Sequence, residues 1–277
     1  MNITFQIDEY SYEINVNEFI NIAIPLSFKG EQPNVFRARK ASAKACETKD
    51  LIGDTRRGGS CNFEEYKLIP HCNGTHTECV GHLTHQRISI HNSLKDAFIP
   101  ATLVTVQPEN ASKSGENYSV KFGVEDKLIT KKILAEALKN TDEIFFHGLI
   151  VRVLPNNEDK MTRKYEESNS PYFSTEAMNF IREKNVKHLL VDLPSIDRTV
   201  DQGKLSNHRI FWKVEEGSYN LEEVSLINST ITELIFVPDN VIDGNYILNL
   251  QISPFESEAS PSRPILFKII KQNLTYI

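Results

Sequence analysis

The middle of the sequence contains two apolar segments that are joined through a segment with helical spacing. Residues 144–154 and 186–193 are rich in β-branched and other apolar side chains, and both predict buried strands. Between them lies an amphipathic segment that Ser174 can cap and Asn185 can end. Strand, helix and strand in this order form a βαβ unit, whose two strands run parallel. The chain is therefore predicted to be an α/β protein with a mixed sheet.

Shorter patterns place the remaining elements around this unit. Alternating apolar residues or β-rich composition predict further strands near residues 3–7, 12–16, 21–27, 66–70, 231–237, 246–252 and 264–270. Residues 130–139 have helical spacing, with Thr130 as the cap, and the polar segment 155–170 predicts a mobile loop. No repeat or composition shift marks a linker, so we expect a single domain over residues 1–277.

Composition narrows the classes of partner. The chain has 277 residues, of which 40% are hydrophobic, and a formal charge of −6, so its charge does not favour binding to nucleic acid. No segment approaches the roughly 18 apolar residues of a membrane helix, and the N-terminus lacks the basic start of a signal peptide. We therefore expect a cytoplasmic protein that acts on a small molecule. Its four cysteines would then be free thiols or metal ligands.

A cluster of histidines is the main candidate site. Five of the eight histidines fall in one short span, at His71, His76, His82, His85 and His91. If residues 72–78 are extended, Cys72, His76 and Glu78 point to one face, and His71 points to the other. A thiolate, an imidazole and a carboxylate with an open position fit a catalytic metal site. The alternative is a solvated strand whose histidines bind nothing.

Two later motifs also contain polar residues that suit a site. Asp192, Ser195 and Asp197 follow the second strand of the βαβ unit, where ligands in α/β sheets tend to bind. The same residue types are frequent in turns, and for an isolated motif a turn is the favoured reading. His208 begins an apolar run, where a single histidine is more often structural than a ligand.

These segments together resemble a family of cyclases that includes bacterial kynurenine formamidase and isatin hydrolase. The family motif His-x-Gly-Thr-His-x-Asp-x-Pro-x-His corresponds to Cys72 to His82, and its Asp-x-x-Ser-x-Asp motif to Asp192 to Asp197. His208-Arg209, Ser260 to Arg263 and the strand Ile22 to Ser27 match further family segments in the same order. The resemblance covers most of the chain and implies a fold of the swivelling β/β/α type.

The resemblance also assigns roles to individual residues. His82 corresponds to the acid/base of the family. The residues that correspond to metal ligands are Cys72, His76, Glu78, His208 and Glu222. Glu223 is the alternative to Glu222, because this assignment assumes a small insertion after Trp212.

The chain departs from the family at three positions of the motif. Cys72 replaces the first histidine of the motif, Glu78 replaces the aspartate and Val80 replaces the proline. A thiolate favours zinc, and manganese is the alternative metal. His71 could replace Cys72 as a ligand if the strand is irregular.

The function implied by the resemblance is metal-dependent hydrolysis of an amide or a cyclic amide, with arylformamide hydrolysis as the leading activity. The metal would lower the pKa of a bound water and polarise the carbonyl, and His82 would transfer the proton. A homodimer or homotetramer is implied as well. The alternatives are a metal-free relative that serves as a binding or scaffold protein, and a metal-dependent cyclase on the same fold.

Overall fold

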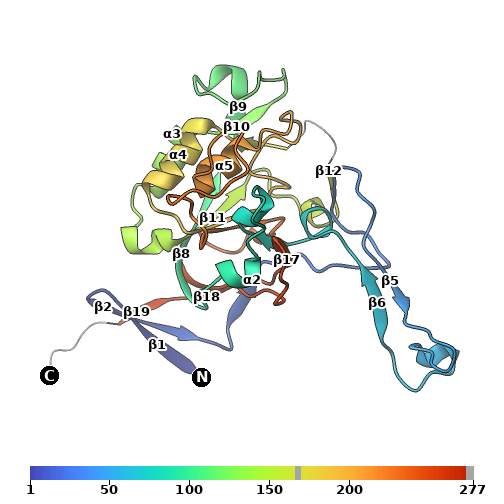
Figure 1. Cartoon of the computed structure of the whole chain (residues 1–277). Helices are drawn as coiled ribbons and strands as arrows, with labels where there is room; N and C mark the ends of the chain where they lie inside the picture. The colour runs from blue at the N-terminus through green and yellow to red at the C-terminus, as the bar shows by residue number, and fades with distance from the viewer. Residues whose placement is uncertain (166–169, 273–277) are drawn as a thin grey trace.

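The computed structural model describes residues 1–165 and 170–272, and within them a large mixed sheet forms the centre of the molecule (Figure 1). In order across the sheet, its strands are β17 (Ala259–Pro261), β7 (His76–Glu78), β15 (Thr230–Glu233), β14 (His188–Val191), β11 (Gly148–Val153), β8 (Ile99–Val106), β16 (Gly244–Asn249), β18 (Ile265–Lys268) and β3 (Phe19–Asn21). The four strands β15, β14, β11 and β8 run parallel, and the remaining pairings are antiparallel. The mixed α/β fold expected from the sequence is confirmed.

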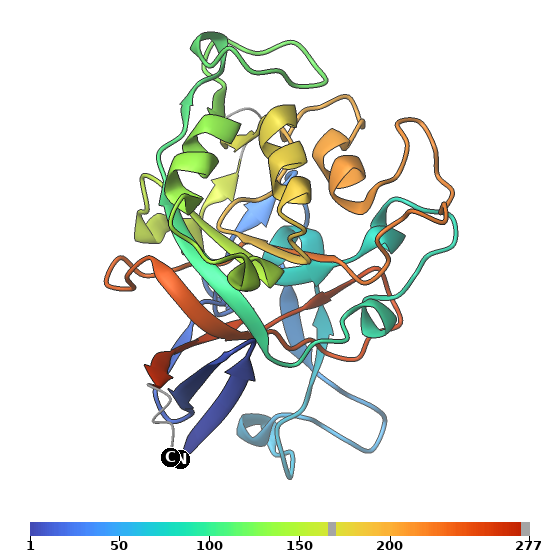
Figure 2. The same cartoon turned by 90° about the vertical axis from the view of Figure 1, so that its left-hand side faces the viewer.

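Helices cover one face of this sheet (Figures 1 and 2). They are α3 (Lys131–Leu138), α4 (Thr175–Glu183) and α5 (Ser206–Trp212), whereas the one-turn helices α1 (Pro70–Asn73) and α2 (Ile90–Ser93) lie elsewhere. Thr130 and Ser174 cap α3 and α4 with their side-chain oxygens, and Asn185 has a φ of 55° just after α4. The caps and the stop are those that the sequence predicts. Short 3-10 helices complete the helical set: η1 (Thr55–Arg57), η2 (Val80–His82), η3 (Ala111–Lys113), η4 (Glu143–His147) and η5 (Glu158–Met161).

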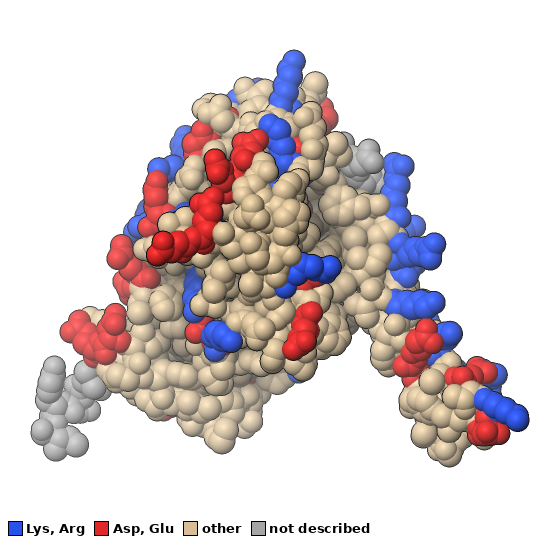
Figure 3. All heavy atoms as spheres, viewed as in Figure 1, with Lys and Arg blue, Asp and Glu red and all other residues tan. Residues whose placement is uncertain are grey.

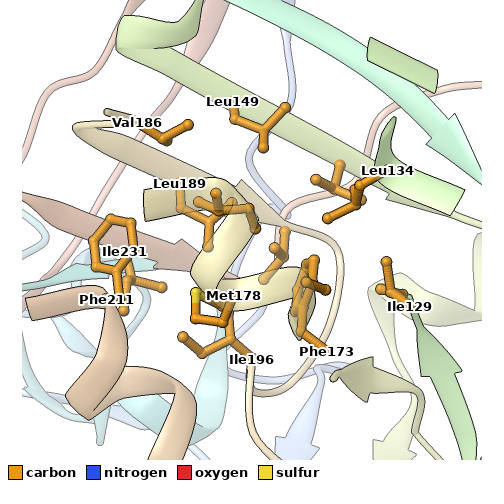
Figure 4. Packing of buried hydrophobic residues seen from close by; sticks show 14 of the residues in the cluster. Ile129, Leu134, Leu149, Phe173, Met178, Val186, Leu189, Ile196, Phe211 and Ile231 are labelled. Carbon is orange, nitrogen blue, oxygen red and sulfur yellow. The ribbon is translucent and has the colours of Figure 1, made fainter. Parts of the chain in front are cut away.

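The βαβ unit is present and holds the main core. Strands β11 and β14 pair in parallel, with Gly148 opposite His188, and α4 lies between them in the chain. Figure 4 shows Met178 of α4, Phe211 of α5 and Leu189 of β14 in one buried layer. Truncating such a side chain to alanine costs about 2–5 kcal/mol, so this layer fixes the helices firmly on the sheet.

Smaller sheets lie around the centre. They are β1 (Asn2–Ile7), β2 (Tyr10–Asn15) and β19 (Ile270–Gln272); β13 (Tyr172–Phe173), β10 (Lys127–Ile129) and β9 (Glu109–Asn110); β12 (Lys164–Tyr165) with β4 (Asn34–Val35); and β5 (Ser42–Ala45) with β6 (Glu64–Lys67). The β5–β6 pair forms an arm that projects away from the rest of the molecule (Figure 1).

Three local expectations differ from the structure. Residues 72–78 are not one extended segment, because Pro70 begins a helical turn and the strand starts only at His76. The strand expected over 21–27 ends at Asn21. The loop expected over 155–170 contains η5 and β12, and its residues 166–169 lie outside the described part. No helix in the described ranges is long and apolar enough to cross a membrane.

Candidate metal centre

Strand β7 brings two of the expected ligands to one face of the sheet. It lies between β15 and β17, and His76 stands directly opposite Glu233 of β15. His76 and Glu78 share a face because side chains two apart in a strand point the same way. Thr77 points to the other face and bonds the Thr232 hydroxyl at 2.8 Å. The two-residue spacing thus places His76 and Glu78 on one face of the sheet, as the sequence predicts.

Helix α5 adds His208 from the side, and the loop after β14 holds its ring. Asp197 accepts hydrogen bonds from the backbone N–H groups of Asn207 at 2.8 Å and His208 at 3.2 Å. Its Oδ2 atom also lies 2.6 Å from His208 Nδ1. The other ring nitrogen, Nε2, is 2.9 Å from Glu78 Oε1 and 3.6 Å from Glu233 Oε1. A buried carboxylate therefore turns the free nitrogen of His208 toward two more carboxylates.

The described residues contain two groups whose donor atoms lie within 4.8 Å of one another and could hold a metal ion. One group is His71, Glu78 and His82, and the other is Glu78, His208 and Glu233. Glu78 belongs to both groups, so it would help to hold an ion in either of them. We call these five residues, with His76, the metal cluster.

The short helix α1 decides between the two neighbours His71 and Cys72. Successive residues of a helix point about 100° apart, so these two side chains diverge. His71 turns to the cluster, with Nδ1 3.1 Å from Glu78 Oε2. Cys72 packs instead among apolar side chains, including Ile24 and Val35. The extended geometry that was to direct Cys72 toward the metal is wrong, because Pro70 starts a helix there.

His82 lies at the accessible side of the cluster. Its Nε2 is 3.9 Å from Glu78 Oε2, and its ring stacks on His71 with centroids 4.5 Å apart. The side chains of His82 and His71 are 27% and 21% exposed, whereas His76 is fully buried. A molecule that approaches the cluster would therefore meet these two rings first.

Glu222 and Glu223 do not join the cluster. Both are exposed in the loop after α5, and the backbone N–H of Glu222 bonds the Ser225 hydroxyl. The later carboxylate at the cluster is Glu233, which the sequence reasoning missed because it assumed an insertion after Trp212. The available signal was an acidic residue inside the apolar strand 231–237.

Electrostatics explain how so many acidic groups share one buried site. Burial by itself would raise the pKa of Glu78, but the nearby His82 and His208 hold that pKa well below its usual range. Burial would likewise lower the pKa of His208, yet Glu78 and Asp197 raise it well above its usual value. Burial lowers the pKa of His82. His208 thus supplies part of the positive charge that the carboxylates require.

A divalent cation fits this donor set better than protons do. His76 Nε2 and Glu78 Oε2 are buried and make no hydrogen bond among the described residues. Buried polar atoms without partners are uncommon in proteins, and each needs an explanation. Imidazole nitrogens and carboxylate oxygens are ligands of zinc and manganese. The residues present therefore suit a divalent metal.

The comparisons with known proteins agree with this fold. The model of the family named Cyclase, described as "Putative cyclase", matches residues 8–198. The chain is an α/β protein with a His/Glu cluster on a mixed sheet, and it belongs to this cyclase family. No sequence among the curated proteins matches it significantly.

Solved structures show the same fold at low sequence identity. A predicted metal-dependent hydrolase from Bacillus stearothermophilus is 14% identical with a TM-score of 0.57, over 90% of this chain and 98% of that chain. Isatin hydrolase A from Labrenzia aggregata, bound to benzyl benzoate, is 13% identical with a TM-score of 0.59, over 90% and 93%. An isatin hydrolase bound to the product analogue thioisatinate is 13% identical with a TM-score of 0.58, over 91% and 92%.

Proposed function

We propose that this protein is a metal-dependent hydrolase that cleaves the C–N bond of an amide or a cyclic amide. The observation that carries the proposal is the buried convergence of His76, Glu78, His208 and Glu233, with unpartnered donor atoms, on the sheet of a cyclase-family fold. Similar folds include isatin hydrolases, which supports a cyclic amide as one substrate class. Arylformamides are the second class to test.

We propose that His71 takes the ligand position that Cys72 would fill by its place in the motif. His71 has a ring nitrogen 3.1 Å from Glu78, whereas Cys72 packs in an apolar cluster. Glu258 lies 3.6 Å from the second ring nitrogen of His71 and can orient that ring. With imidazole and carboxylate donors in place of a thiolate, zinc remains the leading metal and manganese becomes a closer competitor.

The chemistry divides between the cation and the side chains of this chain. A divalent ion held here acts as a Lewis acid and lowers the pKa of water. His82 is exposed enough to reach a substrate and lies beside Glu78. It accepts the proton of the attacking water and passes it to the leaving nitrogen, a general acid/base role. The water oxygen ends on the carbonyl carbon, the C–N bond breaks, and the products are a carboxylate and an amine.

A substrate screen with metal-loaded protein tests the proposal. Isatin and N-formyl aromatic amines should be hydrolysed by the loaded chain and not by its Glu78→Ala variant. The reaction should place one oxygen from ¹⁸O-labelled water in the carboxylate, because only hydrolysis incorporates solvent oxygen. Product without the label would favour the cyclase alternative. Metal binding without turnover on either class would favour a binding or scaffold role, which the replacement of the first histidine by Cys72 motivates.

We also propose that the chain forms a homodimer or a larger homo-oligomer through the β5–β6 arm. A two-stranded hairpin is at best marginally stable alone in water. Tyr66 is 55% exposed on the arm and stacks on Phe28 at 4.7 Å. Lys and Arg side chains follow the outer edge of the arm above its tip, and at the tip Asp and Glu lie beside further Lys and Arg (Figure 3). Light scattering of wild type and Tyr66→Ser would test this, with a shift toward monomer expected in the variant and an unchanged mass contradicting it.

A further inference from the structure

A cavity of about 660 Å³ lies on the helical side of the molecule. Its walls come from α4, from α5 with the loop that follows it, and from the segment around Tyr118 and Ser119. No residue of the metal cluster lines it. The volume falls within the range typical of sites for small molecules. The cavity is therefore large enough to hold a ligand of its own.

Two guanidinium groups border this cavity without a carboxylate partner among residues 1–165 and 170–272. Arg182 of α4 donates from Nη1 to the Val186 carbonyl at 2.5 Å and lies over the Phe211 ring at 5.2 Å. Burial lowers the pKa of Arg182, and no neighbouring carboxylate offsets that effect. Arg182 is half-buried, whereas Arg209 of α5 is buried and its hydrogen bonds go to backbone carbonyls. Cations withdrawn from water without an anion are costly, even when one of them is only half-buried, so the wall favours negative charge.

Three polar side-chain atoms on the same wall lack hydrogen-bond partners. They are Arg182 Nε, Ser119 Oγ and Ser206 Oγ, all shielded from bulk water in the described structure. Because Nη1 of Arg182 is already used, its Nε–Nη2 edge is left for another acceptor. That edge of a guanidinium matches the two oxygens of a planar carboxylate, and serine hydroxyls can rotate to donate to the same group.

Acidic residues at the rim limit the kind of anion. Glu215, Glu216 and Glu222 also line the cavity. Glu216 pairs with Lys204 at 3.5 Å and is 68% exposed, and Glu222 is exposed as well. Negative charges at the rim raise the free energy of a bound dianion more than that of a bound monoanion. The rim thus disfavours a phosphate relative to a single carboxylate.

We propose that this cavity is a binding site for a small organic carboxylate with an apolar body. The carboxylate lies against Arg182, Ser119 and Ser206, and the body lies against Ile210 and Val214. The site is separate from the proposed hydrolytic centre, so it stands or falls independently of the proposed function.

Isothermal titration of the zinc-loaded full chain with benzoate tests this site, with benzamide as the uncharged control. Benzoate should bind, and benzamide should bind at least about tenfold more weakly, because it lacks the charge that Arg182 recognises. Arg182→Gln should weaken benzoate binding by at least about tenfold. Lys184→Gln, the matched control, removes the same charge from just beyond α4 and should leave binding unchanged, since Lys184 does not line the cavity.

A second variant keeps the test decisive if Arg182→Gln unfolds. Asn179 is exposed on α4 and lines the cavity, so Asn179→Trp should block the cavity without disturbing the core. Loss of benzoate binding in this variant supports the site. Undiminished binding in Asn179→Trp would place benzoate elsewhere, such as on the zinc, and would overturn the proposal. Absence of benzoate binding to wild type at about 10 mM would overturn it as well.

Discussion

Asp197 holds the imidazole of His208 in place, with 2.6 Å between Asp197 Oδ2 and His208 Nδ1. The same carboxylate accepts the backbone N–H groups at the start of α5. It therefore fixes the position of the helix and the orientation of the ring together. Partners of this kind set which ring nitrogen of a histidine is free to bind a metal.

Replacing this carboxylate by an amide should weaken metal binding although Asp197 contributes no ligand atom. In Asp197→Asn the amide can donate to Nδ1, which moves the ring proton to Nε2 and blocks that atom. Zinc affinity should fall about 10–100-fold in competition with a chelator. Tyr118→Phe removes a different hydrogen bond to Asp197 and should have a smaller effect. Equal affinity in Asp197→Asn and wild type would contradict the positioning role.

Glu233 and Glu222 give a direct comparison of the structural and the sequence-based assignments. Glu233→Gln removes a charged oxygen from the cluster and should reduce zinc affinity by about 100-fold or more, since direct ligands matter more than their supporting partners. Glu222→Gln changes the same charge on an exposed loop and should leave zinc affinity unchanged. Elemental analysis after dialysis measures both. The reverse order would restore Glu222 as the ligand.

His71 and Cys72 offer a second comparison at adjacent positions. His71→Ala should lower zinc affinity, because it removes an imidazole next to Glu78. Cys72→Ala should keep zinc affinity and lower the free energy of unfolding by about 1 kcal/mol, because it removes a small buried side chain from an apolar cluster. Chelator competition and urea unfolding separate the two effects. Zinc loss in the cysteine variant alone would favour the thiolate.

The pair Asp126–Arg198 should contribute a pH-dependent part of the stability. Burial would raise the pKa of Asp126, but bonds from Arg198 Nε, the Gly123 N–H and the Tyr172 hydroxyl lower it below its usual value. A lowered carboxyl pKa stabilises the fold above the unfolded pKa of about 3.9, and this stabilisation is lost as pH falls through the folded value.

Asp126→Asn tests that sign. The free energy of unfolding of the variant should be about 2 kcal/mol lower than that of wild type. This difference should be the same from about pH 5 to about pH 8. The difference should shrink below about pH 4, where Asp126 begins to protonate in the unfolded chain but still resists protonation in the folded one. Urea titrations across this range provide the measurement. A difference that grows toward low pH would show that the pKa of Asp126 is raised.

The sequence predicted the parts of the fold that depend on local patterns. The Ser174 cap, the apolar face of α4 and the two parallel strands all follow from neighbouring residues, and the structure confirms them. The two-residue period of a strand also predicted that His76 and Glu78 share a face, and the structure has them in one strand. The helical turn that begins at Pro70 is also a local feature, and it places Cys72 among apolar side chains.

Glu233 shows what local patterns do not reveal. It reaches the cluster because β15 pairs with β7, with Glu233 opposite His76, although the two residues are far apart in the chain. Only the pairing and register of these strands determine that contact. Asp197 is similar, since its role depends on where α5 packs. The single domain, the substrate class and the oligomeric state stay predictions.

Metal content of the purified, untagged chain tests the central claim most directly. Elemental analysis should find about one or two zinc or manganese ions per chain in wild type, because Glu78, His208 and Glu233 can hold one ion, and His71 beside Glu78 offers donors for a second. The Glu78→Ala variant should contain none after the same dialysis. Wild-type protein that remains metal-free after reconstitution with zinc and manganese would contradict the account, and the chain would then be a binding protein on the fold of a hydrolase.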